Sequence, residues 1–220
     1  MSGPIVVINP NSNQAVTDGL DQALAPFRLS DGPAIECVTL TEGPFGIESQ
    51  RDVETVSLPL GRLVETRTDA SAFVIACYSD PGIDLCRSLT CAPVLGIQES
   101  GVLTAITRAD RFGVIAIADA SIPRHIRYLR RMGVEGRLAG ERALNISVDD
   151  SARGEGTFAR LVEIGTRLRD DDGAGALILG CAGMARHRLP LERELAVPVI
   201  DPTQAATAMA MGLVLSLKTD

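Results

Sequence analysis

The sequence of 220 residues has no tryptophan, and aromatic residues make up only 3% of it. Because it lacks aromatic side chains for base stacking and has a formal net charge of -7, we expect no binding to nucleic acids. No apolar run approaches the roughly 20 residues of a membrane span, and the negative charge disfavours anionic membrane surfaces. These absences leave a small-molecule substrate as the expected partner.

Groups that could hold a structural metal are also scarce. The sequence has two histidines and no CxxC pair, so we expect no metal site. Its first residues enter a strand pattern without a basic start or an apolar leader. We therefore expect a cytoplasmic protein, in which the cysteines are reduced thiols. The five cysteines are Cys37, Cys77, Cys86, Cys91 and Cys181.

Short apolar runs alternate with segments of helical periodicity, which predicts an α/β fold with mostly parallel strands. The expected strands cover residues 5–8, 35–40, 72–76, 94–97, 112–118, 176–179 and 197–200. A helix over 53–64 contains Pro59, which should kink or break it. A helix that begins at Ile122 has Ser121 as its predicted N-cap and Gly133 as its stop.

The sequence contains two similar halves. Cys77 and Cys181 each follow an apolar strand, at nearly equal distances from the first strand of their half, and each precedes a glycine-containing entry into a helix. A Pro-Val segment follows each cysteine at nearly the same spacing. In parallel sheets the carboxyl ends of the strands form the ligand crevice. We therefore expect the two thiols to enter one cleft from opposite sides.

Two thiols that face one carbon atom suit proton transfer. Inverting a carbon next to a carbonyl group needs a base on one face and an acid on the other. A free thiol has a pKa of about 8.5, and a helix N-terminus lowers it. After Cys77, Asp80 is the expected helix cap and Pro81 the first helical residue. The backbone N–H groups after each cysteine could hold substrate oxygen atoms.

Motifs along nearly the whole chain resemble the aspartate/glutamate/hydantoin racemase superfamily, most closely its hydantoin and allantoin racemase branch. These motifs are INPNS at 8–12, GPFGIES at 43–49, ACYSDPG at 76–82, PVLGI at 93–97, LGCAGM at 179–184 and VPVID at 197–201. The resemblance implies a racemase that needs no cofactor and uses Cys77 and Cys181 as its two-base pair. It also implies a homo-oligomer.

The same resemblance implies the architecture and the substrate contacts. Two pseudosymmetric Rossmann-like subdomains, residues 1–97 with 204–220 and residues 98–203, would enclose the active site in the cleft between them. Asn11 matches a family position that touches substrate, and Ile47 lies in a loop that closes over the ring. The two loops that hold substrate oxygen atoms would contribute Ser79, Asp80, Gly82, Gly180, Ala182, Gly183 and Met184.

Some positions depart from the family pattern. Tyr78 and Ser79 stand where amino-acid racemases carry Asn-Thr, which argues against free aspartate or glutamate as substrate. Asp119 replaces part of a threonine-rich stretch, and Gln98 precedes Glu99 where another residue is usual. Whether these three side chains line the pocket is left open. The substrate stays open between allantoin and a 5-substituted hydantoin.

The remaining reactive or charged side chains have simpler interpretations. Cys37, Cys86 and Cys91 lack the context of a strand end and a helix entry, so we expect them to be structural. His125 and His187 are expected on the solvated surface. One helix face carries four arginines and is interpreted as a solvated face or a subunit contact. These arginines are Arg124, Arg127, Arg130 and Arg131.

Other functions of such a fold stay as alternatives. A maleate-type cis–trans isomerase or an amino-acid racemase would also use two thiols. An arylmalonate-type decarboxylase needs only one thiol, so the cysteine pair argues against it. A non-catalytic two-lobed protein that binds a small ligand would have no need for paired reactive thiols.

Overall fold

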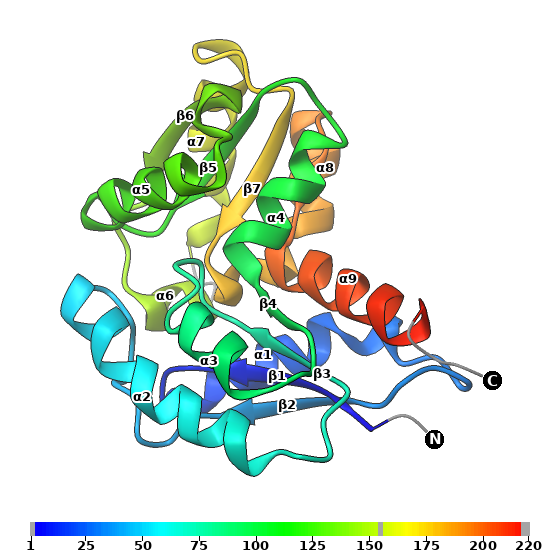
Figure 1. Ribbon diagram of the computed structural model, residues 1–220. Helices are drawn as coiled ribbons and strands as arrows, with labels where there is room; N and C mark the ends of the chain where they lie inside the picture. The colour runs from blue at the N-terminus through cyan, green and yellow to red at the C-terminus, as the bar shows by residue number, and fades with distance from the viewer. Residues whose placement is uncertain (1–2, 154–155, 217–220) are drawn as a thin grey trace.

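The structure is a computed structural model that describes residues 3–153 and 156–216. Its strands form two four-stranded sheets, in the orders β2-β1-β3-β4 and β6-β5-β7-β8. All pairings are parallel, and the order of the second sheet repeats that of the first. This arrangement confirms the predicted α/β fold with two matching halves (Figure 1). The predicted first subdomain includes residues 217–220, which lie outside the described residues.

The strands of the first sheet are β1 (Ile5–Asn9), β2 (Ile35–Thr39), β3 (Ala72–Ile75) and β4 (Val94–Gly96). Those of the second are β5 (Phe112–Ala116), β6 (Leu138–Ala143), β7 (Ala176–Gly180) and β8 (Val199–Ile200). Each falls on a predicted apolar run except β6. The sequence of β6 has no such run, because this half-exposed strand lies at the sheet edge and pairs only with β5.

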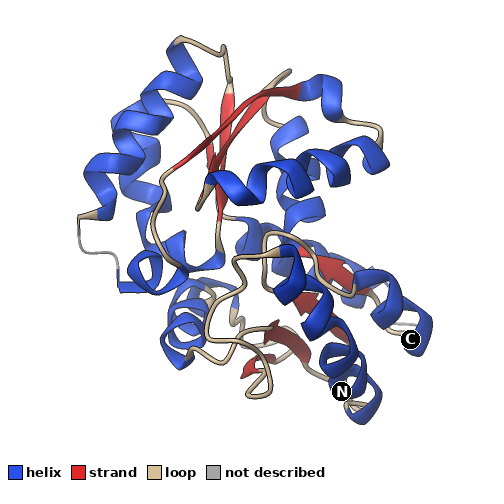
Figure 2. Ribbon diagram, turned by 90° about the vertical axis from the view of Figure 1, so that its left-hand side faces the viewer, coloured by secondary structure: helices blue, strands red, loops and turns tan. Residues whose placement is uncertain are grey.

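Helices flank both sheets (Figure 2). Before β5 the chain forms α1 (Gln14–Ala23), α2 (Gln50–Thr66), α3 (Ile83–Leu89) and α4 (Ile97–Ile106). After β5 it forms α5 (Ile122–Met132), α6 (Val148–Arg153), α7 (Thr157–Asp170), α8 (Arg188–Leu195) and α9 (Pro202–Ser216). Short 3-10 turns are η1 (Ala25–Phe27), η2 (Asp119–Ser121), η3 (Glu135–Arg137) and η4 (Ala182–His187). No described helix has both the length and the apolar character of a membrane span.

Pro59 lies inside α2 without breaking it. Proline removes one backbone hydrogen bond from a helix, but two other features stabilise α2. Ser49 and Asp52 form a capping box at its start, and its apolar face packs on the first sheet. Tertiary packing of this kind supplies most of a helix's stability in a protein.

The start of α5 differs from the prediction, whereas its end does not. Ser121 has a helical backbone and its hydroxyl donates to the carbonyl of Ala118, so it makes no side-chain N-cap. Gly133 ends the helix in the left-handed conformation, at φ 74°, as predicted.

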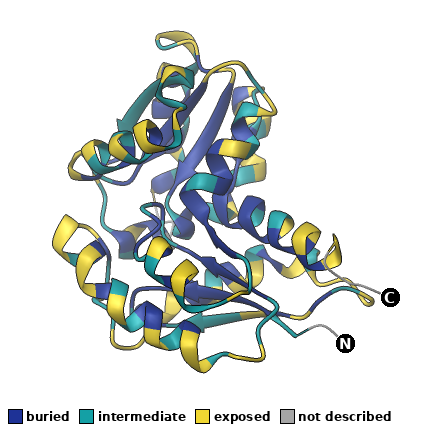
Figure 3. Cartoon of the chain, in the orientation of Figure 1, coloured by how far each residue is buried: buried dark blue, intermediate teal, exposed yellow. Residues whose placement is uncertain are grey.

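The core shows how the two sheets are joined. Along β1, Val6 and Ile8 pack against α2 and α3, whereas Ile5 and Val7 belong to a cluster that extends through α4 and α9 to the second sheet. Helix α9 packs on α4 and contacts β1, β3 and β4 as well as β7. The strands of both sheets are buried apart from the edge strands β2 and β6 (Figure 3). The halves therefore share one core, and the predicted division of the chain into subdomains stays a prediction.

Candidate active site

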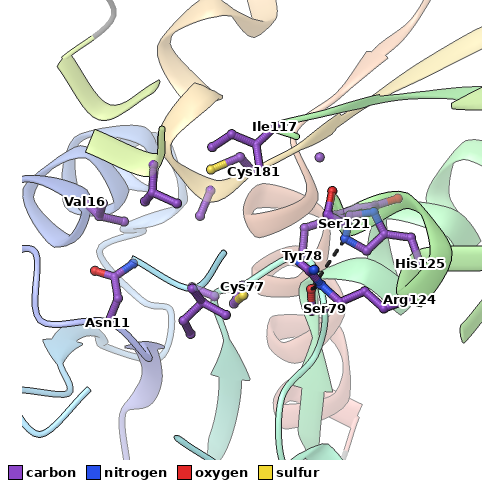
Figure 4. Close-up of a pocket in the computed structure, with 15 residues that line it drawn as sticks. Asn11, Val16, Cys77, Tyr78, Ser79, Ile117, Ser121, Arg124, His125 and Cys181 are labelled. Atoms are coloured by element: carbon purple, nitrogen blue, oxygen red, sulfur yellow. Dashed lines mark hydrogen bonds between the residues drawn. The ribbon is translucent and has the colours of Figure 1, made fainter. Parts of the chain in front are cut away.

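The two predicted cysteines lie at the carboxyl ends of equivalent strands. Cys77 follows β3 after one residue, and Cys181 follows β7 directly. Each of these strands occupies the third position of its sheet. The thiols line one cavity, which Cys77 and Cys181 enter from opposite sides (Figure 4). This cavity is called the thiol cavity below.

The thiol cavity has an empty volume of about 430 Å³, part of it open to solvent. Ser79, Arg124 and His125 lie on one side of it, and Asn11 and Val16 on the other (Figure 4). The complete lining is Asn11, Val16, Ile47, Ala76, Cys77, Tyr78, Ser79, Ile117, Ser121, Arg124, His125, Val148, Gly180, Cys181 and Ala182. The predicted residues Asn11, Ile47, Ser79, Gly180 and Ala182 are therefore brought together with both cysteines.

Burial controls the acidity of Cys77. It raises the pKa of this thiol to about 12, and the nearby Cys181 acts in the same direction. The Arg124 guanidinium and the backbone N–H of Ser79 favour the thiolate, but they offset burial only in part. The expected lowering by a helix N-terminus is absent, because α3 begins only at Ile83.

Cys181 has a similar environment. Burial again raises the pKa of the thiol, while the backbone N–H of Gly183 and the hydroxyl of Ser151 favour the thiolate. The Ser151 Oγ donates to Cys181 Sγ at 3.7 Å, and Ser151 is fully buried in α6. The predicted shift toward higher acidity is therefore wrong for both cysteines, because burial raises the pKa of both thiols. At neutral pH the Cys77 thiol is mainly protonated in the resting protein.

A network of asparagines supports the cavity wall after β1. The Asn9 side chain donates to Asn11 Oδ1 at 3.1 Å, and the Asn13 backbone N–H donates to the same oxygen at 3.0 Å. Both interactions fix the amide of Asn11, whose Nδ2 makes no hydrogen bond to another described residue and so remains available to a ligand. Asn13 caps α1 by accepting from the Ala15 N–H.

The sequence did not predict the polar side of the cavity. Arg124 Nε donates to Ser79 Oγ at 2.9 Å, and His125 Nε2 lies 3.4 Å from the same oxygen. His125 Nδ1 is 2.6 Å from Glu141 Oε1, and both of these side chains are at most 2% exposed. The expectation of a solvated His125 is therefore wrong, whereas Arg124 is half-buried. A basic helix face gives no local signal that one turn of it is buried against Ser79.

Four predicted contacts lie outside the cavity lining. Asp80 accepts from the backbone N–H groups of Gln98 at 2.8 Å and Glu99 at 2.9 Å, so it caps α4 instead of α3. Gly82, at φ 64°, is the N-cap residue of α3. Gly183 faces a neighbouring pocket, and Met184 is fully buried in the core. Substrate contact by these four residues stays a prediction.

The other uncertain residues also lie outside the lining. Gln98 is buried and donates to the carbonyl of His125, and Glu99 accepts from Tyr128. The Asp119 carboxylate accepts from Asn145 at 3.0 Å. His187 is only 8% exposed and stacks on Phe158 at 6.0 Å between ring centroids. The expectation of a solvated His187 is wrong, because this residue lies in η4 and its ring is covered by Phe158 of α7.

The three further cysteines are distant from this chemistry. Cys37 lies half-buried in β2, Cys86 is buried in α3 and Cys91 is exposed. None of them is part of the cavity lining. Within residues 3–153 and 156–216, no group of three or more His, Cys, Asp and Glu side chains is arranged to hold a metal ion.

The chain is similar to several known proteins. A model of the Asp/Glu/hydantoin racemase family matches residues 5–210. A hydantoin racemase of Pseudomonas sp. (strain NS671) is 38% identical over 219 residues, covering 96% of this chain and 85% of that protein. One of Paenarthrobacter aurescens is 34% identical over 215 residues, covering 96% and 90%. The solved structure of an allantoin racemase from Klebsiella pneumoniae has a TM-score of 0.92 and 31% identity, and covers 100% of this chain and 91% of that one.

Proposed function

This chain belongs to the Asp/Glu/hydantoin racemase family, and we propose that it inverts the 5-carbon of a hydantoin-type ring by proton transfer between Cys77 and Cys181. It is therefore an isomerase. The observation that carries the mechanism is the placement of two thiols, from equivalent strands, on opposite sides of one cavity. A single carbon held between them would be reached from both faces.

The mechanism is a two-step proton transfer. One cysteine, as thiolate, removes the proton from the 5-carbon, and the electron pair moves onto the adjacent ring carbonyl to give a planar enolate. The thiol on the other side then donates its proton to the opposite face of the carbon. No net redox change or leaving group is involved. After the reaction the thiol and the thiolate have changed places, and the enzyme regains its starting state when the two cysteines exchange protons with water.

The raised thiol pKa values suit this carbon acid. Proton transfer from a weakly acidic carbon is more favourable to a base of higher pKa, and burial raises the pKa of Cys77 to about 12. The cost is a small thiolate fraction at neutral pH. Arg124 offsets part of that cost because its positive charge favours the Cys77 thiolate. The Nδ2 group of Asn11 supplies a donor for a ring oxygen atom.

The reaction needs both cysteines as free thiols, and the described cysteines are all free. This requirement supports a reducing compartment, and we propose the cytoplasm. The self-association implied by the sequence stays a prediction.

The test uses single enantiomers of allantoin and of 5-substituted hydantoins in heavy water. We expect loss of optical rotation together with deuterium uptake at the 5-carbon. Cys77→Ser and Cys181→Ser should each slow inversion by about 10²–10⁴-fold, the usual contribution of one positioned acid or base. Each variant should still exchange the proton of one enantiomer, and the two variants should act on opposite enantiomers.

Cys91→Ser is the matched control, because Cys91 is exposed and lies outside the cavity lining. It should keep the wild-type rate. Full racemisation by both cavity variants would overturn the two-cysteine mechanism. If no ring substrate is racemised while an alkylating reagent still labels Cys77, the substrate assignment is wrong.

A further inference from the structure

A second hollow adjoins the thiol cavity and carries a concentration of positive charge. It is lined by Gln50, Val53, Ser79, Arg124, Arg127, Tyr128 and Arg131, and is called the arginine groove below. Ser79 and Arg124 line both spaces, so the groove adjoins the thiol cavity at these two residues. The three arginines lie on one face of α5, at positions three and four residues apart. The groove lining contains no aspartate or glutamate.

The guanidinium groups of Arg124 and Arg127 have only neutral hydrogen-bond partners among the described residues. Arg131, in contrast, donates to the Asp84 carboxylate at 2.9 and 3.0 Å. Arg127 donates to Gln50 Oε1 at 3.0 Å. Besides Ser79, Arg124 donates to the backbone carbonyls of Ala120 and Glu48.

The acidic groups near Arg124 are engaged elsewhere. Asp52 and Glu141 act on Arg124 electrostatically. The Asp52 carboxylate, however, accepts hydrogen bonds from Ser49 at the start of α2, and Glu141 is bound to His125. A chain with a net charge of -7 thus keeps two guanidinium groups without a carboxylate partner, next to its candidate active site.

We propose that the arginine groove binds a carboxylate carried by the 5-substituent of the ring, so that the preferred substrates are hydantoins with an acidic side chain. This inference rests on the proposed function. A guanidinium binds a carboxylate through two parallel hydrogen bonds. The 5-substituent of a hydantoin corresponds to an amino-acid side chain, and the carboxylate is the anionic group that such side chains carry. The ring would lie between the thiols while its substituent extends along α5.

The experiment compares two substrates of equal size. They are 5-(2-carboxyethyl)hydantoin and 5-(2-carbamoylethyl)hydantoin, in which a carboxylate and a neutral amide of similar shape end the same chain. We expect kcat/KM to be about tenfold higher for the carboxylate, as for one charge-assisted hydrogen bond, mainly through KM. Added salt should reduce this ratio. Arg127→Gln should bring it close to one.

Arg130→Gln is the control, because Arg130 lies on the same helix but outside the groove and pairs with Glu135. It should leave the ratio at the wild-type value. A wild-type ratio of one or below overturns the proposal. So does a ratio that Arg127→Gln leaves unchanged.

A second measurement does not depend on racemisation. Iodoacetate and iodoacetamide differ in charge at similar size, and both alkylate cysteine. The ratio of their rates at Cys77, measured by mass spectrometry, should fall severalfold in Arg127→Gln and stay unchanged in Arg130→Gln. If the ratio of the two alkylation rates is the same in the wild type and in both variants, carboxylate binding in the groove is rejected, even if ring racemisation is established. A changed ratio without any racemisation would reject the proposed substrate ring instead.

Discussion

At the scale of single residues, the hydroxyl of Ser79 receives its orientation from the second half of the chain. It accepts from Arg124 and lies next to His125 Nε2. Glu141 Oε1 lies 2.6 Å from the other ring nitrogen of His125, and this contact fixes the ring orientation. We therefore regard Glu141 and His125 as positioning residues that act on the substrate through Ser79.

This interpretation predicts a non-additive pair of substitutions. Glu141→Gln keeps the shape of the side chain but removes its charge, and should lower kcat/KM by about tenfold. This is the lower end of the loss that follows when a residue supporting an active-site group is substituted. In a Ser79→Ala background it should cause no further loss, because the group it orients is gone. The measurement is kcat/KM of the wild type, the two single variants and the double variant, at a temperature well below the melting temperature of each. Losses that multiply would contradict the prediction and indicate a purely structural role.

At the scale of elements, the loop after β3 is tied to the start of α4. Gly96, the residue before α4, has no side chain to cap the helix, and a Cβ there would lie 2.1 Å from the Asp80 carboxyl group. Asp80 takes over the cap and accepts from two backbone N–H groups of α4. Burial nevertheless raises the pKa of Asp80 to about 7. The tie holds the loop that contains Cys77 and Ser79 in place.

The raised pKa of Asp80 predicts how stability depends on pH. In the unfolded chain this carboxyl group has its ordinary pKa of 3.8, whereas burial in the folded protein raises the pKa to about 7. Between these values the folded state binds a proton that the unfolded state does not, so the free energy of unfolding falls as pH rises. The slope contributed by one such group is at most about 1.4 kcal/mol per pH unit.

Asp80→Asn should remove this slope, which urea unfolding at pH 5, 6 and 7 would measure. Asp201, whose pKa burial raises to about 6, is present in both proteins and cancels in the difference. Asp84→Asn, on the exposed side of α3, serves as the control and should keep the wild-type slope. Parallel wild-type and Asp80→Asn curves would contradict the assigned pKa.

For the molecule as a whole, contacts between the two halves hold one part of the wall of the thiol cavity. Glu48, in the loop before α2, accepts from the backbone N–H of Val148 at the start of α6, at 3.2 Å. Gly46 of the same loop packs closely on the Val148 side chain. Asn13 donates to Asp149 at 3.1 Å across the same junction. These contacts hold Ile47 and Val148 against the cavity.

Removing one of these contacts should loosen substrate binding more than the fold. Glu48→Ala loses a charged acceptor at a helix N-terminus, a contribution of about 1 kcal/mol, so we expect KM to rise about fivefold with a small change in melting temperature. Glu42→Ala is the control, since Glu42 makes an exposed ion pair with Arg62 in the same part of the chain. An equal rise of KM in both variants, or none in Glu48→Ala, would contradict this role.

The sequence by itself determined the sheets and the position of the thiols. Apolar runs of strand length predicted every strand but β6, and a cysteine directly after such a run must lie at the carboxyl edge of a parallel sheet. Two equivalent strands therefore suffice to place Cys77 and Cys181 in one crevice. These features depend on local periodicity and chain order, which a single sequence contains.

The tertiary structure alone decided the surroundings of those thiols. Arg124 and His125 lie on a basic helix face that looks solvated in sequence, and Glu141 lies on an edge strand without an apolar run; only packing brings them to Ser79. Burial likewise reversed the expected acidity of both cysteines, because desolvation depends on every chain segment that covers a group. Contacts between distant segments, and the water they exclude, leave no periodic trace in the sequence.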